Sequence, residues 1–129
     1  MKVFKFGGAS VKNAEGVRNL YNIVRSQNEK LVIVVSAMGK VTNALEDVLN
    51  SFFNRKPDLD ANIQAIVDYH EGIVCGLFSD RTDIDAKLEL LYSELREITR
   101  HKPSLSYDYE YDRIVSFGEI ISTTIVAAF

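Results

Sequence analysis

Two short apolar runs near the start of the chain have the pattern of β-strands. Residues 2–6 are rich in Val and Phe, which favour a pleated surface. Residues 31–35 form an unbroken aliphatic run bounded by polar turns, a pattern typical of a strand buried on both faces of a parallel sheet. Between the two runs, Asn13 is a good helix N-cap, and apolar residues recur at helical spacing to about residue 26. The pattern therefore predicts a β-α-β unit.

The rest of the chain has helical periodicity. Apolar residues recur every three or four positions over 42–54, 63–77 and 84–98, so each segment predicts a helix. We expect Thr42 or Asn43 to cap the first of these helices. The last segment, from about 110 to 129, is mostly apolar, and its length favours one long helix.

Two strands are too few for a complete open sheet, because such sheets usually contain roughly four or more. Both strands precede residue 36, and the chain ends on an apolar helix. We therefore expect an α/β fold that is the N-terminal part of a parallel-sheet α/β/α sandwich and is helix-rich after residue 42. The prediction treats residues 1–129 as a piece of a longer catalytic domain.

Composition and charge narrow the class of protein. The chain has 129 residues, of which 47% are hydrophobic and 26% charged, as in an ordinary globular domain. Its net charge of −3 is unlike the basic stripe of a nucleic-acid-binding protein. No apolar stretch approaches the roughly 20 residues of a membrane span, and no signal peptide is visible. We expect a cytoplasmic protein that binds neither membrane nor nucleic acid, with its one cysteine, Cys75, serving as a packing residue.

The first candidate site follows the first predicted strand. Lys5 precedes the pair Gly7-Gly8, and Ser10 lies two positions further on. Two glycines allow backbone N–H groups to approach an anion, and a lysine can stabilise phosphoryl charge. The pattern is neither a P-loop nor G-x-G-x-x-G. A strand, a glycine turn and a surface lysine would be the structural alternative.

The second candidate site follows the second strand, so it would lie at the same edge of the sheet. Ser36 and Thr42 are hydroxyl donors that could hold a carboxylate or a phosphate. Helix capping is an equally ordinary role for Thr42, and the two roles are compatible.

Glu119 is the only charged residue between positions 114 and 129. In such apolar surroundings we expect its carboxylate to be partly buried, which requires a cation, several hydrogen-bond donors or a ligand. An ion pair with Lys5 or Arg113 would be the structural explanation. Gly118 beside it indicates a close approach to the backbone. His70, in contrast, lies on an apolar helix face and is interpreted as a hydrogen-bonded core histidine.

Three motifs together resemble those of aspartokinases, members of the amino-acid kinase family. They are Lys5-Phe6-Gly7-Gly8-x-Ser10, then Ser36-Ala37-Met38 with Thr42-Asn43, then Ser116-Phe117-Gly118-Glu119. Their order and separations match the family across nearly the whole chain. One departure is Ala9, where the family usually has threonine, so a contact from that side chain is lost.

The resemblance implies phosphoryl transfer from ATP, with Mg²⁺ held mainly through the nucleotide phosphates, to the side-chain carboxylate of L-aspartate. By that resemblance Lys5 would act on the transferring phosphoryl group, and Gly7, Gly8 and Ser10 would bind phosphate oxygens. Ser36 and Thr42 would help hold aspartate or the phosphate tail, and Glu119 would bind the α-ammonium group of aspartate. No residue is expected to ligate a metal directly. The full-length protein is expected to be a homodimer or a higher homo-oligomer.

The resemblance also implies that the nucleotide-base site and the regulatory ACT domains are absent from these residues, so little activity is expected from them alone. Two other readings stay open: an acetylglutamate- or glutamate-kinase-like enzyme, and a non-catalytic assembly module. Glu119 discriminates among them, because a substrate with a free α-amino group needs an anion there.

Overall fold

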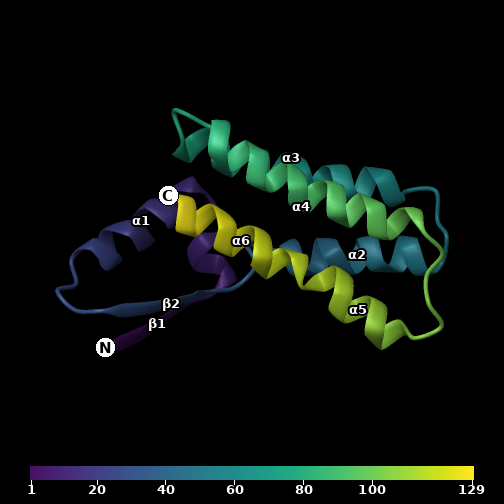
Figure 1. Cartoon of the computed structure of the whole chain (residues 1–129), viewed down its shortest axis with the longest axis horizontal. Coiled ribbons are helices and arrows are strands. Elements are labelled where there is room, and N and C mark those ends of the chain that lie inside the picture. Colours follow the sequence, from purple (N-terminus) through teal and green to yellow (C-terminus); the bar gives the residue numbers. More distant parts are fainter.

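The computed structural model describes residues 1–129 and begins with the predicted β-α-β unit (Figure 1). Its elements, in chain order, are β1 (Lys2–Phe6), the short 3-10 helix η1 (Gly8–Val11), α1 (Ala14–Arg25) and β2 (Leu31–Val35). The strands pair in parallel, with Lys2 opposite Leu31 and Phe6 opposite Val35. The side chain of Asn13 accepts a hydrogen bond of 2.8 Å from the Gly16 N–H, which confirms the predicted N-cap of α1.

Only one face of this two-stranded sheet is covered. Ile33 and Val35 point toward α1 and α6 (Phe117–Ala128), where side chains of all three elements line an apolar cavity of about 280 Å³. Alternation along the strands places Val32 and Val34 on the opposite face, and each is 43% exposed. The prediction that residues 31–35 are buried on both faces is therefore wrong, because no second layer covers the sheet within residues 1–129.

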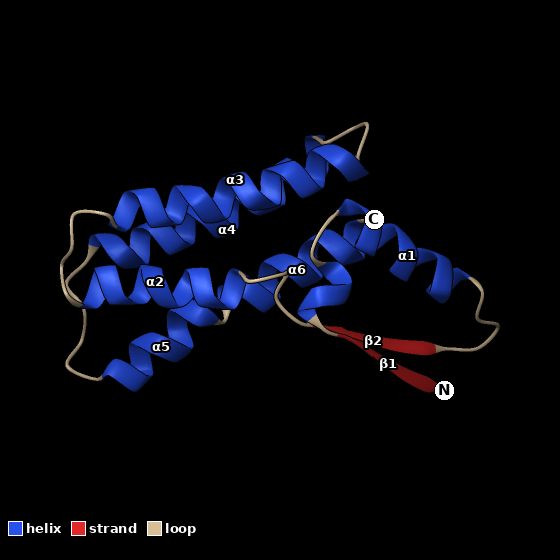
Figure 2. Cartoon of the chain, turned by 180° about the vertical axis from the view of Figure 1, so that it is seen from behind, coloured by secondary structure: helices blue, strands red, loops and turns tan.

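The remainder of the chain is helical, as predicted (Figure 2). The helices before α6 are α2 (Val41–Phe53), α3 (Leu59–Leu77), α4 (Thr82–Arg100) and α5 (Tyr107–Val115). Helix α3 packs antiparallel to α2, α4 returns along α3 in the opposite direction and packs on α6, and α5 packs against α2 (Figures 1 and 2). None of the helices combines the length and the hydropathy that a membrane span requires.

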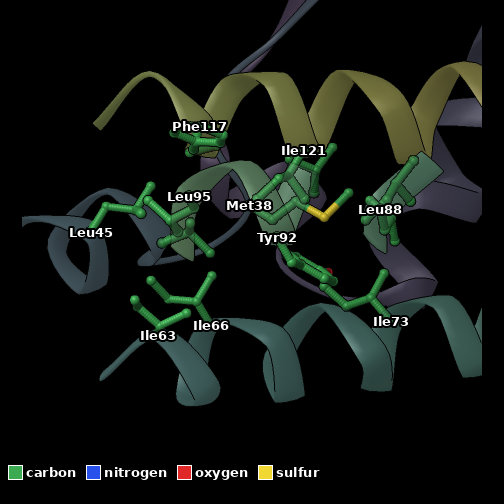
Figure 3. Close-up of a cluster of buried hydrophobic side chains, with 14 of the residues drawn as sticks. Met38, Leu45, Ile63, Ile66, Ile73, Leu88, Tyr92, Leu95, Phe117 and Ile121 are labelled. Atoms are coloured by element: carbon green, nitrogen blue, oxygen red, sulfur yellow. The ribbon is translucent and has the colours of Figure 1, made fainter. Parts of the chain in front are cut away.

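The apolar stripes of these helices form one core (Figure 3). Leu45 from α2, Ile66 from α3 and Leu95 from α4 are almost completely buried there, and Ile121 from α6 closes the same cluster. Met38, in the loop after β2, is also fully buried. The loop that follows the second strand is thereby anchored to the helical core.

Three predicted details of the helices are wrong. The segment 110–129 is two helices rather than one, because the chain turns at Ser116 so that α5 packs on α2 while α6 packs on α4. Helix α2 begins at Val41 with Lys40 as its N-cap, so neither Thr42 nor Asn43 caps it. Cys75 is exposed rather than packed in the core.

His70 behaves as predicted for a core histidine. Its ring is fully buried, and Nδ1 lies 2.8 Å from the carbonyl oxygen of Ile66 one turn earlier. Burial lowers the pKa of His70 below its ordinary value, so the ring is neutral, donates from Nδ1 and leaves Nε2 without a partner.

Candidate functional site

The loops that follow β1 and β2 lie against each other at the carboxyl end of the sheet. The N–H of Ser36 donates to the carbonyl of Phe6, and the N–H of Gly39 donates to the carbonyl of Gly8, both at 3.0 Å. These bonds continue the pairing of the strands beyond the sheet. The Gly7-Gly8 loop and the Ser36 loop therefore lie side by side at one edge of the sheet, as the order of the strands predicts.

Gly8 is required by this close approach. A Cβ atom at position 8 would lie 2.7 Å from the carbonyl oxygen of Ala37 and 2.9 Å from that of Gly39, distances that real Cβ atoms do not adopt. Gly7 differs, because a Cβ atom there would have nothing within 4 Å. Gly7 is exposed and is the glycine of the pair whose backbone is open to an incoming group.

A polar hollow of about 440 Å³ opens beside the same loop. Its seven lining residues include one cation, Lys12, and one acid, Glu15; the others are Ala9, Ser10, Asn13, Gly16 and Asn19. The short helix η1 separates the glycine loop from α1, which begins after its N-cap, Asn13. The dipole of α1 is therefore offset from the glycine pair rather than aimed at it.

Two further residues, Gly16 and Tyr69, fix the position of the segment between the glycine loop and α1, and neither belongs to the sequence motifs. Gly16 allows α1 to pack directly on the backbone carbonyl of Ser10, which a Cβ atom would block. Tyr69, from α3, donates a hydrogen bond to the carbonyl of Lys12 and lies over Gly39, which has a positive φ of 54°. Burial raises the pKa of Tyr69, so the hydroxyl stays protonated and continues to donate.

Ser36 and Thr42 are both half-buried and flank the start of α2. Lys40, the N-cap residue, makes no side-chain capping bond, and the N–H of Val41 donates to the Met38 carbonyl at 3.0 Å, so the open N–H groups at this end of α2 are those of Thr42 and Asn43. Hydroxyl groups and unsatisfied N–H groups together suit a carboxylate or phosphate oxygen. The local geometry is that of an anion-accepting helix terminus beside the glycine loop.

Lys5 is exposed, and none of the ion pairs in the chain includes it. Alternation along β1 places it on the uncovered face of the sheet, opposite Val34 in the register. Its charge is therefore not used by the fold of residues 1–129. The structural alternative of an ion pair with Glu119 is not realised.

The expectation that Glu119 is partly buried is wrong. Its side chain is exposed, in the first turn of α6, where an acidic group is stabilised by the helix dipole. Arg113, the other possible partner, pairs with Glu110 instead. The solitary position of Glu119 in the sequence misleads because the helix presents this one position outward while Gly118 and Ile121 face the core.

The close approach predicted at Gly118, the residue before Glu119, is present in the structure. A Cβ atom on Gly118 would lie 2.8 Å from the Cβ of Ala37 and 3.2 Å from a methyl carbon of Leu45. This confirms the predicted close approach, and it places the start of α6 against the loop that follows β2. Glu119 therefore lies next to the carboxyl end of the sheet, with its carboxylate unpaired.

The buried acid of this part of the chain is Glu110, which the sequence analysis missed. Its carboxylate accepts hydrogen bonds from Ser104 at 3.2 Å and from the Arg113 guanidinium at 3.4 Å, and its residue is 1% exposed. The neighbouring Tyr111 donates to Glu46 of α2 at 3.0 Å, which raises the pKa of Tyr111. Spacing from Arg113 along the helix is the only signal that could have indicated this structural role.

Comparison with known proteins assigns the family. The model of the amino acid kinase family matches residues 1–129. The chain belongs to the amino acid kinase family. It is 33% identical to "Aspartokinase 2, chloroplastic" of Arabidopsis thaliana over 98% of its own length and 24% of that protein. It is 28% identical to an aspartokinase of Chlamydia trachomatis, again over 98% of the chain.

Solved structures show the same fold for this part of the family. Escherichia coli aspartokinase III, crystallised with lysine and aspartate, superposes with a TM-score of 0.86 at 23% identity, over 98% of this chain and 28% of that one. The form with aspartate and ADP superposes with a TM-score of 0.84 at 24% identity. The predicted α/β fold is confirmed, and the chain spans about a quarter of the length of the relatives it matches.

Proposed function

We propose that the chain is the N-terminal portion of the catalytic domain of an aspartate kinase. The complete enzyme would transfer the γ-phosphoryl group of ATP to the side-chain carboxylate of L-aspartate. The product, 4-phospho-L-aspartate, begins lysine, threonine and methionine synthesis. The observation that carries the proposal is the interlocked pair of loops, in which Gly8 packs against the carbonyls of Ala37 and Gly39 beside the open start of α2.

Each predicted site residue has a role that its position supports. Lys5 is a free cation at the carboxyl half of β1, where it would stabilise charge on the transferring phosphoryl group. Gly7, Gly8 and Ser10 would bind phosphate oxygens, and of the three only Ser10 lines the polar hollow. Lys5 does not line the hollow, so we propose that it contacts the transferring phosphoryl group from outside it.

Aspartate would be held on the other side of the paired loops. Ser36 and Thr42, with the open N–H groups of α2, suit a carboxylate. Glu119 is an unpaired anion directly after Gly118, the residue that contacts Ala37, and the α-ammonium group of the substrate would supply its countercharge. Because Glu119 is exposed, this role rests on its position and on the family relationship, rather than on a need to neutralise a buried charge.

The nucleophile in this reaction is already a carboxylate, so the residues of the chain position the reactants and stabilise charge. No group of three or more His, Cys, Asp or Glu side chains in the chain is arranged to hold a metal ion. As the family relationship implies, Mg²⁺ would be held mainly through the nucleotide phosphates. A homodimer or larger homo-oligomer of the full-length protein and a cytoplasmic location remain predictions; the plant relatives are chloroplastic.

A chimeric enzyme tests the proposal. The chain replaces the matching N-terminal quarter of E. coli aspartokinase III, and ADP release is measured with aspartate, N-acetylglutamate or glutamate as the acceptor. The fold match over 98% of the chain makes this graft feasible. We expect turnover with aspartate alone, and turnover with either other acceptor would assign the chain to a different member of the family.

The same assay on residues 1–129 alone is expected to give little or no turnover, because the site is shared with residues outside this span. Glu119→Gln in the chimera should raise the KM for aspartate much more than the KM for ATP. Equal effects on both substrates would assign Glu119 a structural role. A chimera that folds but transfers phosphate to no acceptor would favour the non-catalytic assembly module.

A further inference from the structure

A second polar cavity lies at the opposite end of the helices from the sheet. It measures about 390 Å³ and is bounded by the end of α2, the start of α3 and the end of α4 (Figures 1 and 2). Five of its ten lining residues are basic, namely Arg55, Lys56, Arg100, His101 and Lys102. No acidic residue is among the ten, although the chain as a whole carries a net charge of −3.

These cations come from two separate segments that the fold brings together. Arg55 and Lys56 belong to the turn between α2 and α3, whereas Arg100 to Lys102 lie at the end of α4. Glu97 neutralises part of the second group, since it pairs with Arg100 and with His101 at 3.0 Å each. Asp58, two positions after Lys56, accepts a hydrogen bond of 2.6 Å from Ser51, and this bond together with the charge of Lys56 lowers the pKa of Asp58, so its carboxylate offsets part of the Lys56 charge without forming an ion pair.

Three of the cations have no ion-pair partner in the chain: Arg55, Lys56 and Lys102. Like charges around one cavity repel each other, and an anion bound in the space would relieve that repulsion. Helix dipoles account for basic residues near the ends of α2 and α4, because a cation there offsets the partial negative charge of the free carbonyls. The dipoles do not account for the backbone at Arg55.

Arg55 occupies a position that favours glycine. Its φ is 53°, and it is the only residue other than glycine with a positive φ in the chain. Here α2 ends in a Schellman motif, in which the Lys56 N–H donates to Ser51 at 2.8 Å and the Arg55 N–H donates to Phe52 at 3.3 Å. Glycine would adopt this conformation without strain, so arginine at this position indicates a use for its guanidinium group.

We propose that this cavity binds a small, multiply charged anion that bears phosphate groups. The planar guanidinium of Arg55 fits two phosphate oxygens at once, and Lys56 and Lys102 add point charges from two sides. Phe52 is 3% exposed and the lining contains no Tyr or Trp, so the imidazole of His101 is the one ring on which a base could stack. The size and the lining therefore favour a compact phosphate compound over a nucleic acid. This site is separate from the proposed catalytic loops and does not depend on the proposed function.

Amide NMR titration of the 129-residue chain with pyrophosphate, at constant ionic strength, tests the proposal. We expect saturable shifts at residues 55–59 and 100–102, with citrate at matched charge binding roughly tenfold more weakly because carboxylates fit the cluster less well. Shifts confined to residues 7–10 and 36–43 would instead report the catalytic loops alone and would overturn the second site. Citrate binding as tightly as pyrophosphate would overturn the assignment to phosphate.

Variants separate binding from folding. Arg55→Gly should weaken pyrophosphate binding at this cavity roughly tenfold, as loss of a charge-assisted hydrogen bond predicts, while the melting temperature stays the same or rises. Lys102→Gln should also weaken binding, and Lys87→Gln, an exposed lysine earlier on α4, should not. Binding that survives both Arg55→Gly and Lys102→Gln would overturn the proposal, because the anion would then be held elsewhere.

Discussion

The helical part of the chain and the β-α-β unit are stabilised very differently. Helices α2 to α6 bury apolar residues on several sides, and Leu49, Ile66 and Leu95 are at most 2% exposed. The β-α-β unit buries Val17 and Leu20 of α1 but leaves much of β2 exposed. The candidate site lies where the two regions meet, on loops of the less buried one, which the helical core holds through Met38 and Tyr69.

This difference indicates how the fold divides its tasks. A well-packed helical core supplies stability, whereas the carboxyl half of β1 and the first turn of α6 carry charged groups that the fold does not use, Lys5 and Glu119. Functional residues are commonly placed on loops held by a rigid scaffold. Substitutions in the two regions should therefore separate stability from activity.

The largest change in stability is expected in the helical core. Leu49→Ala removes a fully buried side chain and should lower the free energy of unfolding by about 3 kcal/mol. Leu90→Ala, at a position on α4 that is 73% exposed, is the matched control and should change it by less than about 0.5 kcal/mol. Urea denaturation measures both, and similar losses for the two variants would contradict the assignment of the core.

A comparable change in activity, without a change in stability, is expected at Lys5. In the chimeric enzyme, Lys5→Met should reduce kcat by roughly 10²–10³, the loss typical of a group that stabilises developing charge. The melting temperature should stay the same, because Lys5 is exposed and forms no ion pair. An unchanged kcat would remove the proposed role of its charge.

The next effect is expected where the two regions touch. Gly8→Ala introduces a Cβ atom 2.7 Å from the Ala37 carbonyl, so one loop must move, at a cost of about 1–3 kcal/mol in stability together with loss of activity. Gly72→Ala, in α3, has nothing within 4 Å of the new atom and should stabilise the protein by about 0.5–1 kcal/mol. Thermal denaturation distinguishes them, and equal shifts would show that Gly8 is not a packing residue.

The smallest effect is the pH dependence from His70. Burial lowers the pKa of His70 in the folded state below its ordinary value of 6.5, so below that pH the unfolded chain binds more protons than the folded one. The free energy of unfolding is therefore unaffected by His70 above pH 6.5, and it decreases as the pH falls from 6.5 toward the lowered pKa. Denaturation midpoints measured between pH 7.5 and 5 report this decrease, and the dependence of the midpoint on pH should be weaker in His70→Gln. An unchanged dependence in this variant would show that other groups cause it.

Local pattern was sufficient for most elements of the fold. The β-α-β unit, the Asn13 cap and the helical stripes follow from periodicity and capping chemistry, which depend on neighbouring residues only. The kink at Ser116 was not predictable in this way, because α5 and α6 pack on different helices. The exposure of Cys75 and of Glu119 also depends on which side of a helix faces the core, and apolar neighbours in the sequence do not settle that.

The amino-acid sequence by itself determined the family, the order of the elements and the residues that could carry phosphoryl-transfer chemistry. Only the tertiary structure decided how those residues meet: that Gly8 packs on Ala37, that Glu119 is exposed while Glu110 is buried, and that cations 45 positions apart share one cavity. Motifs record which chemical groups are present. Contacts between segments distant in the sequence decide burial and charge pairing, because both depend on what surrounds a side chain in space.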